Sequence, residues 1–207
     1  MSPFPNDPYC YPGTNVLINL ENIRDQKVLN QFEVQTASVC IANLAVNPIK
    51  GPFDAARLRE THRCIFGNVY PWAGEFRKGI GMMTKNRSWF VVAYGPSENV
   101  PSALAETLTK LKLEHDLHGL ESAQFAARLA FYYSEFDAIH PFREGNSRTL
   151  RAFTSGLAQA AGRRLDWSRT GSTPEDRKRL YHARDLAVMR GDTSELARII
   201  GADLVAG

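Results

Sequence analysis

The chain has 207 residues, 43% hydrophobic and 23% charged, which is typical of one globular domain with a buried core. Its formal net charge of +3 is spread along the chain without a dense basic run, which argues against a nucleic-acid-binding surface. No window reaches about 18 uninterrupted apolar residues, and the start lacks the parts of a signal peptide. Three scattered cysteines form no zinc spacing. We expect a cytoplasmic domain with no membrane contact.

The first segment, residues 1–24, is rich in Pro, Gly and Asn and predicts an ordered loop packed on the body. A helix is predicted over residues 26–45, with Asp25 as its N-cap. Its inward face is predicted to hold Val28, Phe32, Gln35, Val39 and Ala42.

The next helix is predicted over residues 55–66, because Asp54 is a good N-cap and the flanking Phe53 and Leu58 suit a hydrophobic staple. A short β-hairpin follows. Its apolar arms are residues 80–83 and 89–92, on either side of a polar stretch.

Helical spacing returns after Pro101 and continues to the end. The predicted helices are one that ends by Gly119, then residues 122–139, 148–160 and 174–190, and a last one that opens at residue 192. The clearest stripe is Phe125, Leu129, Tyr132 and Phe136. The predicted architecture is therefore mainly α, with one small hairpin.

The residues between the two central helices suit a phosphate site. Pro141 prevents the first helix from continuing, and Gly145-Asn146 tolerate unusual backbone angles that point N–H groups at one anion. The following helix adds its N-terminal donors. Arg148 and Arg151 lie on one side of that helix and can hold polyphosphate oxygens.

Two further residues of this segment bring chemistry to the phosphate site. Glu144 offers a hard oxygen ligand for Mg²⁺, and His140 offers a base that is neutral near pH 7. Each feature alone is more often structural, but their joint order within one short segment is specific.

This segment resembles the signature of the Fic family, HPFx(D/E)GNGRxxR. The matching positions are His140, Pro141, Phe142, Glu144, Gly145, Asn146, Arg148 and Arg151. Ser147 stands where the family most often has Gly. Similar residues outside the signature extend the resemblance to about residues 7–170. The resemblance implies a single Fic domain over 1–207, a helical bundle with a hairpin flap, and C-terminal helices over about 174–205.

The resemblance implies a protein adenylyltransferase that moves AMP from ATP to a hydroxyl of another protein. His140 would be the base and Glu144 the Mg²⁺ ligand. The nucleotide would be held by Gly145, Asn146, Ser147, Arg148 and Arg151, with the Asn146 side chain near the α-phosphate. In the flap, Lys85, Asn86 and Phe90 would hold the target peptide and the nucleotide in register.

Regulation is also implied by the family. Many members carry an inhibitory helix with the motif (S/T)xxxE(G/N), whose Glu pairs with the arginine at the position of Arg151. Ser102 to Glu106 comes close, but Thr107 follows and the location is wrong, so an ordinary surface helix is favoured there. The chain thus resembles a bacterial toxin inhibited by a small antitoxin, with type II topoisomerase subunits as suggested targets.

Alternatives remain. Doc-like relatives phosphorylate their targets and have Lys where Ser147 stands. A host-directed secreted effector and a binding module without turnover are further readings. Ser147 is expected to keep nucleotide binding, although it costs more than Gly if its φ is positive and its side chain can crowd a phosphate.

Overall fold

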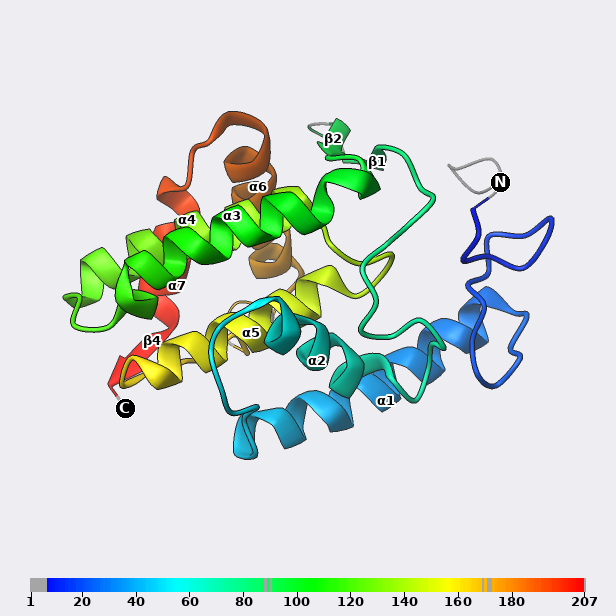
Figure 1. Cartoon of the computed structure of the whole chain (residues 1–207), viewed down its shortest axis with the longest axis horizontal. Helices are drawn as coiled ribbons and strands as arrows, with labels where there is room; N and C mark the ends of the chain where they lie inside the picture. Colours follow the sequence, from blue (N-terminus) through cyan, green and yellow to red (C-terminus); the bar gives the residue numbers. More distant parts are fainter. Residues whose placement is uncertain (1–6, 88, 90, 169, 171–172, 207) are drawn as a thin grey trace.

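The computed structural model describes residues 7–206 except 88, 90, 169, 171 and 172, and it is mainly helical (Figure 1). The α-helices are α1 (Gln26–Val46), α2 (Ala55–Phe66), α3 (Val100–Leu113), α4 (Ser122–Ile139), α5 (Asn146–Ala160), α6 (Pro174–Arg190) and α7 (Ser194–Asp203). The strands are β1 (Met83–Asn86), β2 (Val91–Tyr94), β3 (Arg163–Leu165) and β4 (Leu204–Ala206). The predicted class, a mainly α fold with a hairpin, is confirmed.

The predicted helix starts are confirmed by their caps. The Asp25 carboxylate accepts hydrogen bonds from the N–H groups of Lys27 and Val28 at 2.8 and 3.0 Å. The Asp54 carboxylate accepts one from the Arg57 N–H at 2.8 Å. Each carboxylate satisfies donors that the first turn of a helix leaves unpaired.

The core is centred on α4 and α5. Figure 1 shows α5 between α4 on one side and α1 with α2 on the other. The predicted α4 stripe is buried as expected, with Phe125, Leu129, Tyr132 and Phe136 inaccessible to solvent. This apolar contact fixes the two helices whose facing ends carry the motif loop, residues 140–145.

The predicted inward face of α1 is mostly wrong, although Phe32 is half-buried and packs against the core. Leu29, Glu33 and Ala37 are buried, whereas Val28 and Val39 are 49% and 71% exposed. The reason is that Glu33, which looks like a surface residue in the sequence, pairs with an arginine of α5 and turns its own face of the helix inward. The predicted face therefore lies largely in solvent.

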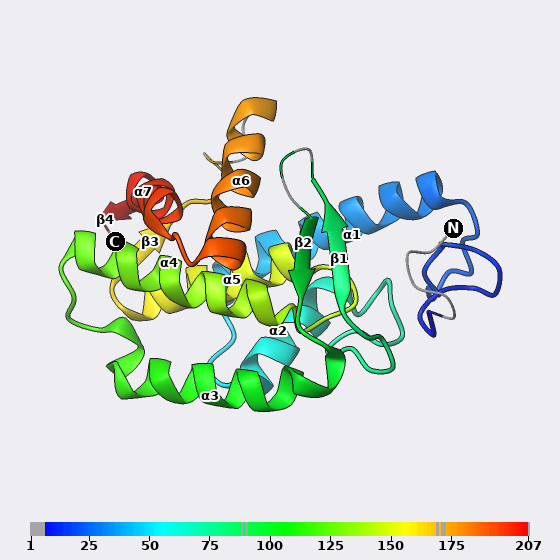
Figure 2. The same cartoon turned by 90° about the horizontal axis from the view of Figure 1, so that it is seen from above.

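The hairpin is present but shifted relative to the prediction. Met83 pairs with Tyr94 and Asn86 with Val91, so the polar stretch forms most of β1 rather than the turn. Alternation explains the buried face, because Met83, Val92 and Tyr94 are buried while Thr84 and Asn86 on the opposite face are exposed. Lys85 pairs with Val92, shares the buried face and is half-buried. Figure 2 shows the hairpin beside α6.

Two helix ends also differ from the prediction. α3 ends at Leu113 and is followed by a 3₁₀ turn over His115–Leu117 with positive φ, rather than continuing towards Gly119. α5 begins at Asn146, two residues early. None of the helices in the described part of the chain is long and apolar enough to cross a membrane.

Candidate active site

His140 ends α4 in the left-handed conformation, with φ 50° and ψ 62°. The buried Arg77 guanidinium holds this turn, because its Nε donates to the His140 carbonyl at 2.7 Å and its Nη2 to the Ile139 carbonyl at 3.2 Å. The Arg77 N–H also donates to the Pro141 carbonyl at 2.9 Å. Arg77 therefore satisfies the end of α4 and stabilises a conformation that costs about 1–2 kcal/mol for a residue other than glycine.

The His140 ring has a defined tautomer. Its Nδ1 lies 3.3 Å from the backbone carbonyl oxygen of Asp137 and 3.7 Å from the Oδ1 of the same residue. Both oxygens are acceptors, so the hydrogen of the neutral ring belongs on Nδ1 and the lone pair remains on Nε2. The Tyr94 ring of β2 stacks on the imidazole at 3.8 Å between centroids.

The charge state of His140 suits a base. Burial, with a smaller effect from the nearby charge of Lys85, lowers the pKa of His140 to about 4, against the opposing effect of Asp137. The ring is therefore neutral at pH 7. It is also only 2% exposed.

This burial of His140 predicts a pH dependence of stability. Its pKa lies below the ordinary value of 6.5, so the unfolded chain takes up the proton first as the pH falls. The contribution is complete above about pH 6.5 and is lost towards pH 4, by about 3 kcal/mol in the free energy of unfolding. Urea unfolding at about pH 7 and 4.5 measures this loss. His140→Gln, which does not titrate, is expected to lose less, and an equal loss would contradict the assignment.

The start of α5 is built as predicted from Gly145 and Asn146. Gly145 has φ 79° and packs against the Phe66 ring. The Asn146 side chain accepts from the Phe142 N–H at 2.9 Å and donates to the Phe142 carbonyl at 2.7 Å, which closes the motif loop. Its contact with an α-phosphate stays a prediction. Among the described residues nothing bonds to the N–H of Ser147, so that donor points out of the helix end unpaired.

Glu144 lies at the edge of the loop with a side chain that is 45% exposed. Its Oε1 accepts from the Gly145 N–H at 2.8 Å. Burial raises the pKa of the Glu144 carboxyl, but the Gly145 N–H, Lys85 and Arg148 together hold that pKa below its ordinary value. The group is therefore an ionised carboxylate at neutral pH.

His62 of α2 supports Glu144 from behind. Its ring donates to the Glu144 carbonyl at 3.1 Å and accepts from the Gly74 N–H at 2.8 Å, and it stacks on the Phe142 ring at 3.9 Å. Burial lowers the pKa of His62 to about 4, so the ring stays neutral. Sequence reasoning did not indicate this role for His62.

The two motif arginines, Arg148 and Arg151, differ in whether a carboxylate pairs with them. Arg148 donates to Glu33 of α1 at 2.6 Å, and the Tyr70 hydroxyl binds the same carboxylate. Arg151 makes a long contact of 3.4 Å from its Nε to the Ser147 carbonyl, and no carboxylate in the described part of the chain pairs with it. The guanidinium of Arg151 is thus available to an anion.

Ser147 has a helical backbone, so the expected cost of positive φ does not arise. Its hydroxyl accepts from the Arg184 guanidinium at 3.0 Å, which turns the side chain towards α6. Arg184 also binds both carboxylate oxygens of Asp137, at 2.7 and 3.0 Å. Sequence reasoning missed both partners; the one available signal was that Asp137 precedes His140 by one helical turn.

The flap lies across this site. Lys85 is near enough that its charge affects the pKa of both His140 and Glu144. Asn86 ends β1 on the exposed side. The predicted contact of Phe90 lies outside the described residues. Between the two strands, the Trp89 indole donates to Asp185 of α6 at 2.8 Å, which links this residue to α6.

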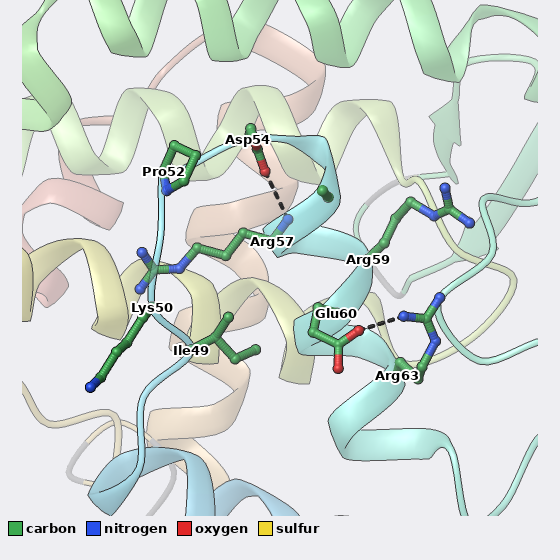
Figure 3. Close-up of a pocket in the computed structure, with 9 residues that line it drawn as sticks. Ile49, Lys50, Pro52, Asp54, Arg57, Arg59, Glu60 and Arg63 are labelled. Atoms are coloured by element: carbon green, nitrogen blue, oxygen red, sulfur yellow. Dashed lines mark hydrogen bonds and ion pairs between the residues drawn. The ribbon is translucent and has the colours of Figure 1, made fainter.

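A separate cavity of about 400 Å³ lies on another face of α2 (Figure 3). It is lined by Ile49, Lys50, Pro52, Asp54, Ala56, Arg57, Arg59, Glu60 and Arg63. None of the predicted site residues contributes to it.

A helical domain with a histidine-bearing loop before a helix N-terminus and a hairpin across it is the Fic class of fold. The solved N-terminal Fic domain of a VirB-translocated Bep effector protein from Bartonella quintana, with bound ADP, is 27% identical and has a TM-score of 0.85 over 96% of this chain and 95% of that one. The Fic/DOC family model matches residues 52–158. The chain belongs to the Fic/DOC family.

Curated relatives agree. Protein adenylyltransferase VbhT of Bartonella schoenbuchensis is 38% identical over 79% of this chain, which spans only 33% of VbhT. A probable protein adenylyltransferase of Escherichia coli, Fic, is 35% identical over 78% of this chain and 76% of its own length. The predicted family is confirmed.

Proposed function

We propose that this chain is a protein adenylyltransferase, which transfers AMP from ATP to a hydroxyl side chain of another protein. The observation that carries the proposal is a neutral, oriented His140 imidazole next to a helix start whose Arg151 has no acidic partner among the described residues. The enzyme class, a nucleotidyltransferase, is supported by relatives at 35–38% identity that are named protein adenylyltransferases. ATP as co-substrate is supported by the neighbour that holds ADP.

In the proposed reaction, Nε2 of His140 removes the proton of the target hydroxyl. The hydroxyl oxygen attacks the α-phosphorus in line. A new P–O bond forms, the bond between the α-phosphorus and the bridging oxygen breaks, and pyrophosphate leaves. Because Nδ1 already carries a hydrogen that faces Asp137, the ring is oriented with its basic nitrogen free.

The phosphates would bind at the start of α5. The N–H groups of Asn146 and Ser147 and the guanidinium of Arg151 are suited to hold the phosphates of ATP that leave as pyrophosphate. The Gly145 N–H is engaged by the Glu144 carboxylate, so its use by a phosphate requires Glu144 to turn away. Arg148, already held by Glu33, would act from a fixed position.

The residues present fit a Mg²⁺ ion bound mostly through phosphates and water. The described residues contain no cluster of three metal-ligating side chains, whereas Glu144 offers a half-exposed carboxylate beside the phosphate site. Mg²⁺ commonly takes one or two protein carboxylates and substrate phosphates. When bound, it would offset the charge of the polyphosphate.

The flap would receive the target as an added strand. The edges of a two-stranded hairpin offer unpaired backbone groups that an extended peptide can use. Lys85, which faces the site, and Asn86 and Phe90 are the proposed contacts to target and nucleotide. The C-terminal helices, about 174–205, would belong to the same single domain over 1–207.

We place the chain as a bacterial toxin inhibited in trans by a small antitoxin that carries (S/T)xxxE(G/N). Two observations support this: Arg151 is free to accept a glutamate, and α1, which contacts α5 through Glu33, exposes Val28 and Val39 for an apolar partner. Type II topoisomerase subunits are the suggested targets. Expression alone is expected to arrest bacterial growth; growth equal to that of a His140→Ala control would oppose the toxin assignment.

Mass spectrometry of the modified target tests the reaction. An added AMP supports adenylyl transfer, whereas an added phosphate identifies the Doc-like alternative on the same fold. Failure to modify any protein in a bacterial lysate, with modification in a eukaryotic lysate, would favour a host-directed effector; the Bartonella quintana neighbour is described as a VirB-translocated effector protein. No transfer in either would indicate a binding module.

Arg151→Ala is expected to weaken binding of a non-hydrolysable ATP analogue by about 10–100-fold, because a charged hydrogen bond contributes about 1.5–3 kcal/mol. Calorimetry with the analogue and with AMP measures the effect. AMP, which lacks the outer phosphates, serves as the control and should bind equally to both forms. An equal loss of affinity for AMP would mean that Arg151 binds a part of the nucleotide other than the outer phosphates.

A further inference from the structure

Arg184 is a buried arginine of α6 that connects two separate parts of the site, the end of α4 and the start of α5. It is 3% exposed and lies outside residues 52–158, the part that the family model matches. Its Nε and Nη2 bind the two oxygens of Asp137, at 3.0 and 2.7 Å, and its Nη1 binds the Ser147 hydroxyl at 3.0 Å. All three donors are directed by one planar, rigid group.

The two partners stand on either side of the motif loop. Asp137 lies in the last turn of α4, where its backbone carbonyl and its Oδ1 face Nδ1 of His140. Ser147 lies in the first turn of α5, where its N–H is a proposed phosphate ligand. The Arg184 guanidinium therefore bridges Asp137, which faces His140, and Ser147, at the proposed phosphate-binding start of α5.

We propose that Arg184 is a positioning residue for AMP transfer, which fixes the His140 imidazole relative to the phosphate-binding start of α5, and that the Ser147 hydroxyl is its matched acceptor. This proposal rests on the proposed function and deepens it. It assigns a role to the hydroxyl of Ser147, because glycine at that position could not accept the hydrogen bond from Nη1 of Arg184.

The energetics favour positioning over simple stabilisation. A fully buried ion pair costs desolvation that its attraction repays only partly, and well-packed apolar groups often stabilise a core as well or better. The ion pair of Arg184 and Asp137 instead fixes the relative position of the two side chains, because the planar guanidinium and the carboxylate form two parallel hydrogen bonds. A misplacement of about 1 Å at a reacting group costs about 10²-fold in rate.

Arg184→Lys is the central variant because it keeps a positive charge beside Asp137 but cannot reach both Asp137 oxygens and Ser147 with a rigid fork. With α-labelled ATP and lysate, we expect kcat to fall about 10–100-fold while KM for ATP changes less than about threefold. Arg184→Met, which removes the charge, is expected to lose stability as well. A folded Arg184→Lys with kcat within about twofold of the wild type overturns the proposal.

A double-mutant cycle tests the link to Ser147. Ser147→Ala keeps the backbone N–H and removes the acceptor. If both residues act through one contact, the kcat losses of Ser147→Ala and Arg184→Lys do not multiply in the double variant. Fully multiplicative losses would overturn the matched role of Ser147.

A readout without turnover separates this proposal from the proposed function. Nitrogen-15 spectra of histidine-labelled protein, with His140 assigned by its absence in His140→Ala, report the ring tautomer. We expect one Nδ1–H form in the wild type and a mixture in Arg184→Lys. Identical His140 signals overturn the positioning role, whether or not AMP is transferred. An unlabelled target in the wild type would defeat the proposed function while leaving the spectral test intact.

Discussion

His140→Ala is expected to lower AMP transfer by about 10²–10⁴-fold, the range that a positioned general base contributes. The effect should appear in kcat, because the ring is stacked on Tyr94 and bonded to Asp137 rather than placed among the phosphate ligands. Binding of a non-hydrolysable ATP analogue should be retained within about threefold. Transfer of label from α-labelled ATP and calorimetry measure the two quantities.

Two controls separate the chemistry of His140 from its packing. His140→Gln fills more of the buried space and remains neutral, so it should be more stable than the alanine variant yet equally slow. His118→Ala changes an exposed histidine whose ring contacts the His115 carbonyl, and should leave activity unchanged. Activity of His140→Gln within tenfold of the wild type would remove His140 from the role of base.

Gly145→Ala is expected to destabilise the fold by about 2–5 kcal/mol and to abolish nucleotide binding. The residue has φ 79°, which costs an alanine about 1–2 kcal/mol, and its new Cβ would overlap the Phe66 ring. Relief of that overlap requires Phe66 or the start of α5 to move, and either movement displaces the Ser147 N–H. Urea unfolding and calorimetry with the ATP analogue measure the losses.

Gly162→Ala is the matched control for Gly145→Ala. Gly162 also has a positive φ, of 74°, but a Cβ there would meet nothing within 4 Å. It should lose only the backbone term of about 1–2 kcal/mol and keep nucleotide binding. Equal destabilisation by the two substitutions would mean that the contact with Phe66 has no energetic importance.

Local signals in the sequence account for much of the fold. Asp25 and Asp54 each indicate a helix start, because the carboxylate accepts a hydrogen bond from an N–H group in the adjacent first turn. The α4 stripe is predictable for the same reason, since a fully buried face repeats at helical spacing. Where the partner lies far away in the chain, this reasoning fails. Glu33 is buried because Arg148 neutralises it from another helix, and no spacing within α1 indicates that contact.

The candidate site divides in the same way. The motif from His140 to Arg151 is contiguous, so its loop and helix start follow from residue types that act locally. The residues that orient the motif come from elsewhere: Arg77 holds the turn at His140, and Arg184 joins Asp137 to Ser147. Long-range side-chain contacts of this kind depend on the packing of distant helices, which a single sequence does not specify.

The most direct test of the account compares ATP labelled at the α-phosphate with ATP labelled at the γ-phosphate, in a bacterial lysate with wild-type protein and with His140→Ala. We expect that a protein band acquires label from the α-position, that the γ-label gives none, and that His140→Ala abolishes the band. Label from the γ-position, or an undiminished band with His140→Ala, would contradict it.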